Sequence, residues 1–397
     1  MWDRVTVLFR SAPGRRRRFT LDGSRLAFVL VVVLGAALAG GAWFYIPSQV
    51  GEGAFTLSSG PHDLNIEIVE VVRGEITLSG PRKNVGHPGI LGLQWEGGYA
   101  QVGPVTGDSD DGVTRGLLPL AGGEAPPVPG PARIDSFAFS GDPSTRGLDF
   151  REVRYGAPLG EQAAWVTDGG GSTWVLLVHG KGATRQEALR ILPTLTGLGL
   201  TSMVITYRND RESIQDPEGV YEYGATEWAD LAAAVSYAVH EGEADQIVLY
   251  GYSMGGAISV SFLQRSVLAH RVVAVVLDAP MLDFAATVEL ALSEEPLIGR
   301  FAGPLRWLTG HRLDIDWEAL DYLDDDLARV NVPILLFHGT SDDVVPIETS
   351  ERLNELLPDG LVEFVTTEGA GHVRSWNVDP GRYEARVRDF LERELAP

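Results

Sequence analysis

Five short runs of β-branched and apolar residues recur along the chain from residue 173 onward. They occupy residues 173–180, 201–207, 246–252, 272–280 and 332–339. Because apolar side chains do not alternate with polar ones, the runs fit strands buried on both faces of a parallel sheet. Helical patterns separate or follow them, at residues 185–195, 226–239, 254–265, 350–357 and 380–394. This alternation predicts an open α/β sheet, in which ligands bind at the carboxyl ends of the strands.

A pentapeptide of the G-x-S-x-G type, residues 251–255, stands where the third run ends and the third helical pattern begins. A nucleophile must sit on a sharp turn with its Oγ exposed, and glycines two residues to either side let strand and helix approach closely. Elsewhere the pentapeptide would be typical of an ordinary turn. At a strand-to-helix junction it predicts that Ser253 is a nucleophile.

A serine hydroxyl needs a base to remove its proton and a carboxylate to orient that base. Among eight histidines, His372 lies in a glycine-rich loop between the last predicted strand and the C-terminal helix. A base in that loop can reach over the sheet edge. Asp342 follows the fifth apolar run, 332–339, and precedes His372. This gives the chain order serine, aspartate, histidine. Asp343 and Asp278 are competing candidates for the acid.

The stretch H-G-T-S-D-D-V-V-P at 338–346 resembles the H-G-x-x-D-x-x-V-P stretch of α/β-hydrolases of the serine-aminopeptidase-like and dipeptidyl-peptidase-like branches. In those proteins the first aspartate of this spacing is the triad acid, so the resemblance favours Asp342. It covers about residues 148–391. It implies an α/β-hydrolase fold in domain 148–397, a mostly parallel sheet with helices on both faces and a lid insertion at about 281–327. The motifs are specific for the superfamily and much less so for substrate.

Two backbone N–H groups are expected to form an oxyanion hole. One belongs to Met254, which follows the nucleophile, and the other to Lys181, in the H-G-K-G stretch after an earlier strand. The second assignment rests on the resemblance of His179-Gly180 to the family's H-G pair. The Lys181 side chain is expected to be solvated, and the mechanism needs no metal or cofactor.

The substrate pocket is less well defined by sequence. At residues 206–213, T-Y-R-N-D-R-E-S stands where the family has a pattern resembling D-Y-R-G-x-G-x-S, so a loop that usually borders the active site has lost its glycines. Aromatic residues of the insertion suggest helices that form a lid or substrate wall over the serine. The candidates for lining the substrate are Tyr252, Arg208, Trp307 and the tryptophan of Ser375-Trp376.

Residues 51–135 have a different pattern of apolar and polar residues. Apolar and polar side chains alternate between clusters of Gly, Pro and Asn, a pattern that predicts a small β-rich domain. The acidic run at 108–111 fits a solvated loop better than a calcium site, because it lacks EF-hand spacing. Residues 120–135 are rich in Pro, Gly and Ala and fit a linker or a surface excursion. This domain could recruit a cell-envelope partner.

The N-terminal segment predicts a membrane anchor. Residues 1–25 are basic, with four arginines at 15–18, and residues 26–46 carry no charge. About 21 residues at ~1.5 Å each span ~31 Å, which matches a bilayer core. The positive-inside tendency keeps the basic end in the cytoplasm, so the catalytic domain is expected outside. A signal peptide cleaved near the A-L-A at 37–39 would instead release a secreted protein.

Composition excludes several classes of function. The formal net charge is −22, from 32 basic and 54 acidic residues, which would repel the phosphates of a nucleic acid. The chain has no cysteine. A disulfide framework, a thiolate nucleophile and a Cys-ligated zinc site are therefore excluded.

These features predict a membrane-anchored serine hydrolase on the outside of a bacterial cell. The serine would attack an ester, thioester or amide carbonyl, and water would resolve the acyl-enzyme. An esterase or lipase-like activity is expected first, because a peptidase usually adds a recognisable site for a peptide terminus. A serine peptidase and an acyltransferase would share the triad and stay open. An exported, non-catalytic binding or scaffold protein is the alternative from another class, which the intact triad disfavours.

Overall fold

The computed structural model describes residues 5–7, 19–21, 55, 63–119, 124–210, 213–217, 219–293, 299–323 and 325–396. The chain divides into two compact units, one of residues 1–54 and 303–315 and one of residues 55–302 and 316–397. In the first unit, β1 (Val5–Val7) and β2 (Phe19–Leu21) form a short antiparallel pair. The second unit holds a small barrel and a large sheet with its helices.

The large sheet has eight strands in the order β16-β15-β14-β13-β11-β12-β10-β9. Only the pairings of β10 are antiparallel, and the remaining pairings are parallel. The strands are β9 (Phe150–Ala157), β10 (Gly160–Thr167), β11 (Thr173–Val178), β12 (Thr201–Ile205), β13 (Gln246–Tyr252), β14 (Val272–Asp278), β15 (Ile334–Gly339) and β16 (Val362–Thr367). The five apolar runs thus form central strands, while the β9–β10 hairpin at one edge was not among them.

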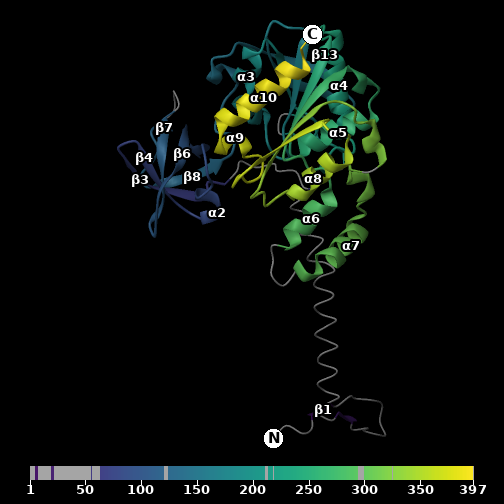
Figure 1. The fold of residues 1–397 in the computed structure, drawn as a ribbon. Coiled ribbons are helices and arrows are strands. Elements are labelled where there is room, and N and C mark those ends of the chain that lie inside the picture. The colour runs from purple at the N-terminus through teal and green to yellow at the C-terminus, as the bar shows by residue number, and fades with distance from the viewer. Residues whose placement is uncertain are drawn as a thin grey trace. The chain divides into compact units, whose positions relative to one another are not determined.

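Helices cover both faces of this sheet. The helices α3 (Leu192–Gly197) and α10 (Pro380–Glu394) pack on one face, and α4 (Trp228–His240), α5 (Met254–Arg265) and α8 (Ile347–Leu356) cover the other (Figure 1). The predicted helix at 185–195 is instead a 3₁₀ turn, Arg185–Arg190, followed by α3. Helix α10 begins at a proline, and the carboxylate of Asp379 accepts the N–H of Arg382 at 3.0 Å. An aspartate at the N-cap followed by proline at the first helical position is a favoured way to begin a helix.

The core follows from the apolar runs. All residues of β12 and β15 are buried, and all but one residue in each of β11, β13 and β14 are buried. Strands with mostly apolar side chains are accommodated where both faces of the sheet are covered. The strand that leads to Ser253 therefore lies in the middle of the sheet, between β11 and β14.

The β-rich region is a closed barrel with the strand order β3-β4-β7-β6-β5-β8. Its strands are β3 (Ile66–Val72), β4 (Glu75–Ser79), β5 (Leu91–Trp95), β6 (Gly98–Ser109), β7 (Gly112–Pro119) and β8 (Gly130–Asp135), with a short helix α2 (Arg82–Val85). All its pairings are antiparallel. Alternate residues fill its interior, as the period-2 pattern requires. The predicted small β-rich domain is therefore a barrel.

The predicted insertion lies between β14 and β15 and is helical. It contains α6 (Phe284–Ser293), α7 (Ala302–Leu313) and three 3₁₀ turns, Gly299–Phe301, Glu318–Leu320 and Asp325–Arg329. Most of α7 belongs to the first compact unit. Its role as a lid stays a prediction.

The predicted single-pass membrane localisation is corrected by the structure. A spanning helix needs about 20 apolar residues. Within the described ranges, no helix is long and apolar enough to cross a bilayer, and the longest, α10, has 15 residues. Residues 26–46, on which the prediction depended, lie outside those ranges.

Candidate active site

Ser253 occupies a strained turn between β13 and α5. Its φ is 50° and its ψ is −117°, in a region that serine rarely adopts and that persists only where surrounding contacts hold it. The Ser253 N–H donates to the carbonyl of Asp278 on β14 at 3.0 Å. A Cβ on Gly255 would come within 2.0 Å of the carbonyl oxygen of Val178. Glycine is therefore required at position 255 by the close approach of α5 to β11.

Three side chains from loops at the carboxyl ends of the strands form a continuous chain of hydrogen bonds. Nε2 of His372 lies 2.8 Å from Oγ of Ser253, and Nδ1 lies 2.8 Å from Oδ2 of Asp342. With a neutral imidazole, Nδ1–H donates to the carboxylate and Nε2 accepts the serine hydroxyl proton. This is the arrangement in which a histidine can act as a general base.

Asp342 is held as an ion. Its Oδ1 accepts the N–H groups of Val344 and Val345, both at 2.9 Å, and its Oδ2 also lies 3.3 Å from Nε2 of His338. Burial alone would raise the pKa of the Asp342 carboxyl, but the His372 and His338 imidazoles hold it well below its usual range. A permanent negative charge therefore faces His372.

The other two acid candidates lie elsewhere. Asp343 is exposed. Asp278 is fully buried and accepts the hydroxyl of Tyr383 at 3.0 Å, while Tyr383 also contacts Tyr250, with 2.7 Å between their hydroxyl oxygens. Burial raises the pKa of Asp278 to about 6 despite the opposing effect of Arg190. Of the three, only Asp342 has a hydrogen bond to His372 among the described contacts.

His372 is more basic than an ordinary histidine. Burial lowers the pKa of its imidazole, but the Asp342 carboxylate, together with Glu187 and Asp278, raises it, and the net shift is upward. The imidazolium formed when His372 takes a proton is stabilised by the same carboxylate.

The two expected oxyanion donors lie near Ser253. Met254 is the first residue of α5, so its N–H precedes the helix's own hydrogen bonds and lies at the positive end of the helix dipole. Lys181 follows Gly180, where a Cβ would come within 3.1 Å of Cβ of Ser253. The Gly180 N–H itself donates to Oε2 of Glu187 at 2.8 Å. Because that donor is used, Lys181 stays the expected second donor of this loop.

Two buried groups that the sequence did not single out for this role hold the oxyanion loop. Glu187 fixes Gly180, as described above. Oδ2 of Asp210 lies 2.9 Å from Nε2 of His179 and accepts the Tyr207 N–H at 3.0 Å. Burial disfavours a charged His179, but Asp210 outweighs this and raises its pKa. The altered 206–213 loop therefore contributes a carboxylate that anchors the residue before Gly180.

The Lys181 side chain differs from the expectation of a solvated group. It is half-buried, with its ammonium nitrogen 5.7 Å from the centre of the Tyr221 ring. Burial lowers the pKa of Lys181 to about 8.

Three of the four substrate-lining candidates lie in the protein core instead. Tyr252 is 2% exposed, and the Arg190 guanidinium lies 5.4 Å from its ring centre. Arg208 is engaged in a two-pronged ion pair with Asp230, with N–O distances of 2.8 and 3.0 Å. The indole of Trp376 donates to Glu384 at 2.8 Å and packs edge-on against Phe139.

The fourth candidate, Trp307, lies on α7. It is 66% exposed and stacks on His311 with 5.7 Å between ring centres. Its proposed contact with substrate stays a prediction.

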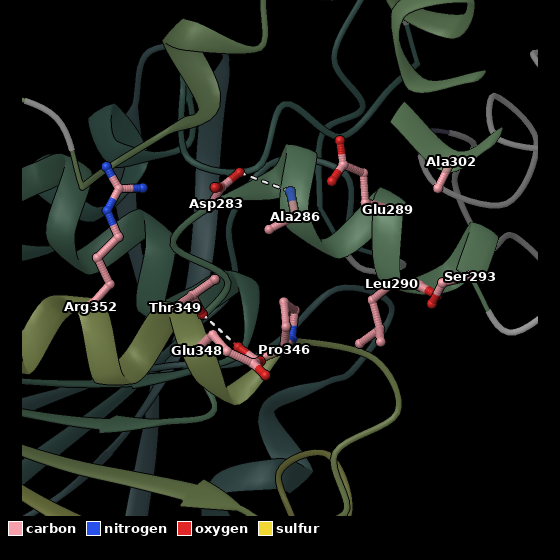
Figure 2. A pocket seen from close by; sticks show the side chains of 10 residues that line it. All are labelled: Asp283, Ala286, Glu289, Leu290, Ser293, Ala302, Pro346, Glu348, Thr349 and Arg352. Carbon is pink, nitrogen blue, oxygen red and sulfur yellow. Dashed lines mark hydrogen bonds between the residues drawn. The ribbon is translucent and has the colours of Figure 1, made fainter. Parts of the chain in front are cut away.

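Two cavities of the described residues are not lined by the three triad side chains. One, of about 470 Å³, lies between α6 and α8, and Figure 2 shows Asp283, Glu289 and Glu348 around it together with Arg352. The other, of about 1030 Å³, lies between the barrel and the sheet, and its lining includes Trp95, Arg133, Trp165, Thr184 and Arg185. Within the described ranges, no group of three or more His, Asp or Glu side chains could hold a metal ion.

Comparisons with known proteins agree with this architecture. An uncharacterised protein of Mycobacterium tuberculosis is 28% identical over 248 residues, covering 62% of this chain and 77% of the relative. The 2-hydroxy-6-oxo-2,4-heptadienoate hydrolase of Pseudomonas putida is 28% identical over 278 residues, covering 57% and 92%. The structure of a Pyrococcus furiosus esterase aligns with a TM-score of 0.52 at 21% identity, covering 65% of this chain and 97% of that one.

Family models match both parts of the second unit. Residues 67–135 match a domain of unknown function. Residues 163–386 match the model of the alpha/beta hydrolase family. None of these matches selects the serine-aminopeptidase-like branch, which stays a prediction. Because the second match spans more than half of the chain, the chain belongs to the α/β hydrolase family.

Proposed function

We propose that the chain is a serine hydrolase that cleaves a carboxylic ester through an acyl-enzyme on Ser253. The observation that carries this proposal is the pair of 2.8 Å contacts through His372, which joins the serine hydroxyl to a buried carboxylate. A serine, an imidazole and a carboxylate in this order are the groups that acyl transfer requires. A core role alone would not need a strained serine beside a histidine.

The first half-reaction forms the acyl-enzyme. Nε2 of His372 takes the hydroxyl proton as Oγ of Ser253 attacks the carbonyl carbon. The carbonyl oxygen becomes an oxyanion, to which the N–H groups of Met254 and Lys181 donate. When this intermediate collapses, the bond to the leaving oxygen breaks, and the imidazolium gives its proton to that oxygen. An alcohol leaves.

The second half-reaction restores the enzyme. Nε2 of His372 takes a proton from water, whose oxygen attacks the acyl carbon. The bond to Oγ then breaks, Ser253 recovers the proton from the imidazolium, and a carboxylic acid leaves. Throughout both halves, Asp342 keeps the Nδ1 proton in place and stabilises the imidazolium.

An ester is the preferred substrate for two reasons. The P. furiosus structure is that of an esterase and the P. putida relative is a hydrolase, which supports hydrolysis of a small molecule. The sequence also offers no recognisable site for a peptide terminus. A peptidase and an acyltransferase would use the same three residues, so product analysis decides between them.

The direct test is labelling of the full chain with a fluorophosphonate probe. We expect the wild type to be labelled and Ser253→Ala and His372→Ala to lose labelling. Ser293→Ala, which changes an exposed serine at the end of α6, should label like the wild type. Equal labelling of wild type and Ser253→Ala would refute the proposal. A panel of nitrophenyl esters, peptide anilides and alcohol acceptors then identifies the reaction.

A further inference from the structure

The loop that carries His372 is rich in glycine and locally strained. It has glycines at 369 and 371, which give the backbone extra freedom. Directly after the histidine, Val373 has a φ of 53°. A β-branched residue is an outlier in this left-handed region and stays there only if its surroundings hold it. Contacts from outside the loop must therefore fix the position of His372.

One of these contacts comes from a buried guanidinium. Arg190 is 2% exposed, and its Nη1 donates to the carbonyl of Val373 at 3.0 Å. The same nitrogen donates to Oδ1 of Asn377 at 3.0 Å and to the carbonyl of Ser136 at 3.3 Å. Arg190 thus ties the strained peptide to the side chain of Asn377.

Asn377 extends this network to the barrel. Its side chain is fully buried, and its Nδ2 donates to the carbonyls of Ile90 at 2.6 Å and Ser136 at 2.9 Å. Its backbone carbonyl accepts the Ile90 N–H at 2.8 Å. A Cβ on Gly89 would come within 2.0 Å of that carbonyl oxygen, so only glycine permits this approach. The Nδ2 end of the carboxamide therefore joins Asn377 to the barrel side, and the Oδ1 end joins it to Arg190, which holds Val373.

A second contact lies closer to the histidine. Nη1 of Arg374 lies 2.9 Å from Nδ1 and 2.7 Å from Nε2 of His87, in the loop before β5. Burial and the Arg374 charge lower the pKa of His87 to about 4. At neutral pH the His87 ring is therefore uncharged and offers an acceptor nitrogen to the guanidinium.

The barrel segment that makes these contacts is itself rigid. The Arg115 side chain is fully buried in the barrel and donates to the carbonyls of Val85, His87 and Gly89, at 2.9, 2.8 and 2.7 Å. Its Nε donates to the carbonyl of Gly103 at 2.8 Å. The planar guanidinium of Arg115 thus holds the backbone of residues 85–90 through three carbonyl groups.

We propose that residues 85–90 of the barrel position the general base: they clamp the segment 371–378, which runs from the His372 loop into the short helix α9 (Ser375–Val378), through Asn377 and Arg374, so that His372 stays within reach of Ser253. This inference rests on the proposed function. It makes the barrel part of the hydrolase site. His87, Asn377 and Arg374 are positioning residues, because they act through the loop and none has a described contact with Ser253.

The test uses the full chain and four variants. Asn377→Asp keeps the shape and the acceptor for Arg190, but places a carboxylate oxygen against the carbonyls of Ile90 and Ser136. His87→Ala removes a half-exposed acceptor at lower risk to folding, and His87→Gln restores an acceptor. Thr106→Ala is the control, because its hydrogen bonds stay within the barrel.

Three experiments are made on each variant: the rate of fluorophosphonate labelling against pH, steady-state kinetics (kcat and KM) on a cleaved nitrophenyl ester, and amide hydrogen exchange of a peptide spanning 371–378. For Asn377→Asp we expect labelling and kcat to fall by about 10- to 100-fold, with KM within about twofold, because small misplacements of a catalytic group have effects of this size. The pH midpoint of labelling should fall, since a displaced His372 loses its contact with Asp342. Amide hydrogen exchange of residues 371–378 should be faster in Asn377→Asp than in the wild type.

His87→Ala should show the same changes in smaller measure, His87→Gln should restore the wild-type rate, and Thr106→Ala should match the wild type. Wild-type labelling, pH midpoint and exchange in folded Asn377→Asp and His87→Ala would overturn the clamp. If the wild type itself is not labelled, the proposed function fails. The exchange of 371–378 in the barrel variant His87→Ala then still decides whether the barrel holds this loop.

Discussion

Replacing Asp342 by asparagine should nearly abolish the reaction while leaving the shape of the site intact. Oδ1 of Asp342 accepts two backbone N–H groups at 2.9 Å, and this fixes which end of an asparagine carboxamide points where. The oxygen must stay with those two donors, so the NH₂ group faces Nδ1 of His372. That nitrogen then accepts a hydrogen bond, and the ring proton moves to Nε2.

A proton on Nε2 prevents His372 from accepting the Ser253 hydroxyl proton. Loss of the correct tautomer in a Ser-His-Asp triad costs about 10⁴-fold in kcat, or ~5 kcal/mol in the activation barrier. We expect the second-order rate of fluorophosphonate labelling to fall by about this factor in Asp342→Asn, with a circular dichroism spectrum like that of the wild type. Residual activity should rise at high pH, where hydroxide can remove the Ser253 hydroxyl proton in place of His372.

Asp343→Asn is the matched control, because it makes the same chemical change one residue further on, at an exposed side chain. It should label within about twofold of the wild type, as is usual for surface positions. If Asp343→Asn lost labelling and Asp342→Asn kept it, the assignment of the acid and the tautomer argument would both be refuted.

Three further predictions concern the His372 imidazole, the close approach at Gly255 and the buried ion pair of Arg208. The raised pKa of His372 means that labelling should be lost as pH falls, with a midpoint above the ordinary imidazole value of about 6.5, as a labelling-rate profile would measure. Gly255→Ala should unfold at a clearly lower temperature, because its Cβ would overlap the Val178 carbonyl, whereas Gly303→Ala, which meets nothing within 4 Å, should unfold at or above the wild-type temperature in the same thermal melt. Arg208→Ala should lower the free energy of unfolding in urea by about 3–5 kcal/mol, because it leaves the buried Asp230 carboxylate without its cationic partner, and an unchanged midpoint would contradict the buried ion pair.

The sequence predicts the central sheet because its strands are buried on both faces and therefore lack polar interruptions. The edge hairpin escapes this rule. In β9 most side chains are exposed or half-buried, and β10 begins with Gly, Glu and Gln, so neither reads as an apolar run. The α/β-hydrolase fold is confirmed by the family match and by the strand order, whereas the branch within the superfamily is not distinguished.

The candidate site divides in the same way. Ser253, Asp342 and His372 lie at strand ends whose spacing along the chain is characteristic, so sequence can propose them. Side chains whose partner is far away in sequence cannot be placed from their own type. Tyr252 and Arg190 are one example, since an aromatic residue beside a nucleophile is equally compatible with a pocket wall and with a core contact. The same holds for Asn377, whose importance depends on its hydrogen bonds to Ile90, 287 residues away.

The network around His372 also sets an order of events during synthesis. The Ser253–His372 contact closes a separation of 119 residues, and the Arg374–His87 contact one of 287. Ribosomes deliver the barrel and the nucleophile turn long before β16 and the histidine loop. The nascent protein therefore carries Ser253 without its general base, while most strands of the sheet are already available to pair. Under the proposed clamp, hydrolytic competence arrives only when the His372 loop has reached both the Ser253 turn and the barrel, which ties activity to the completion of folding.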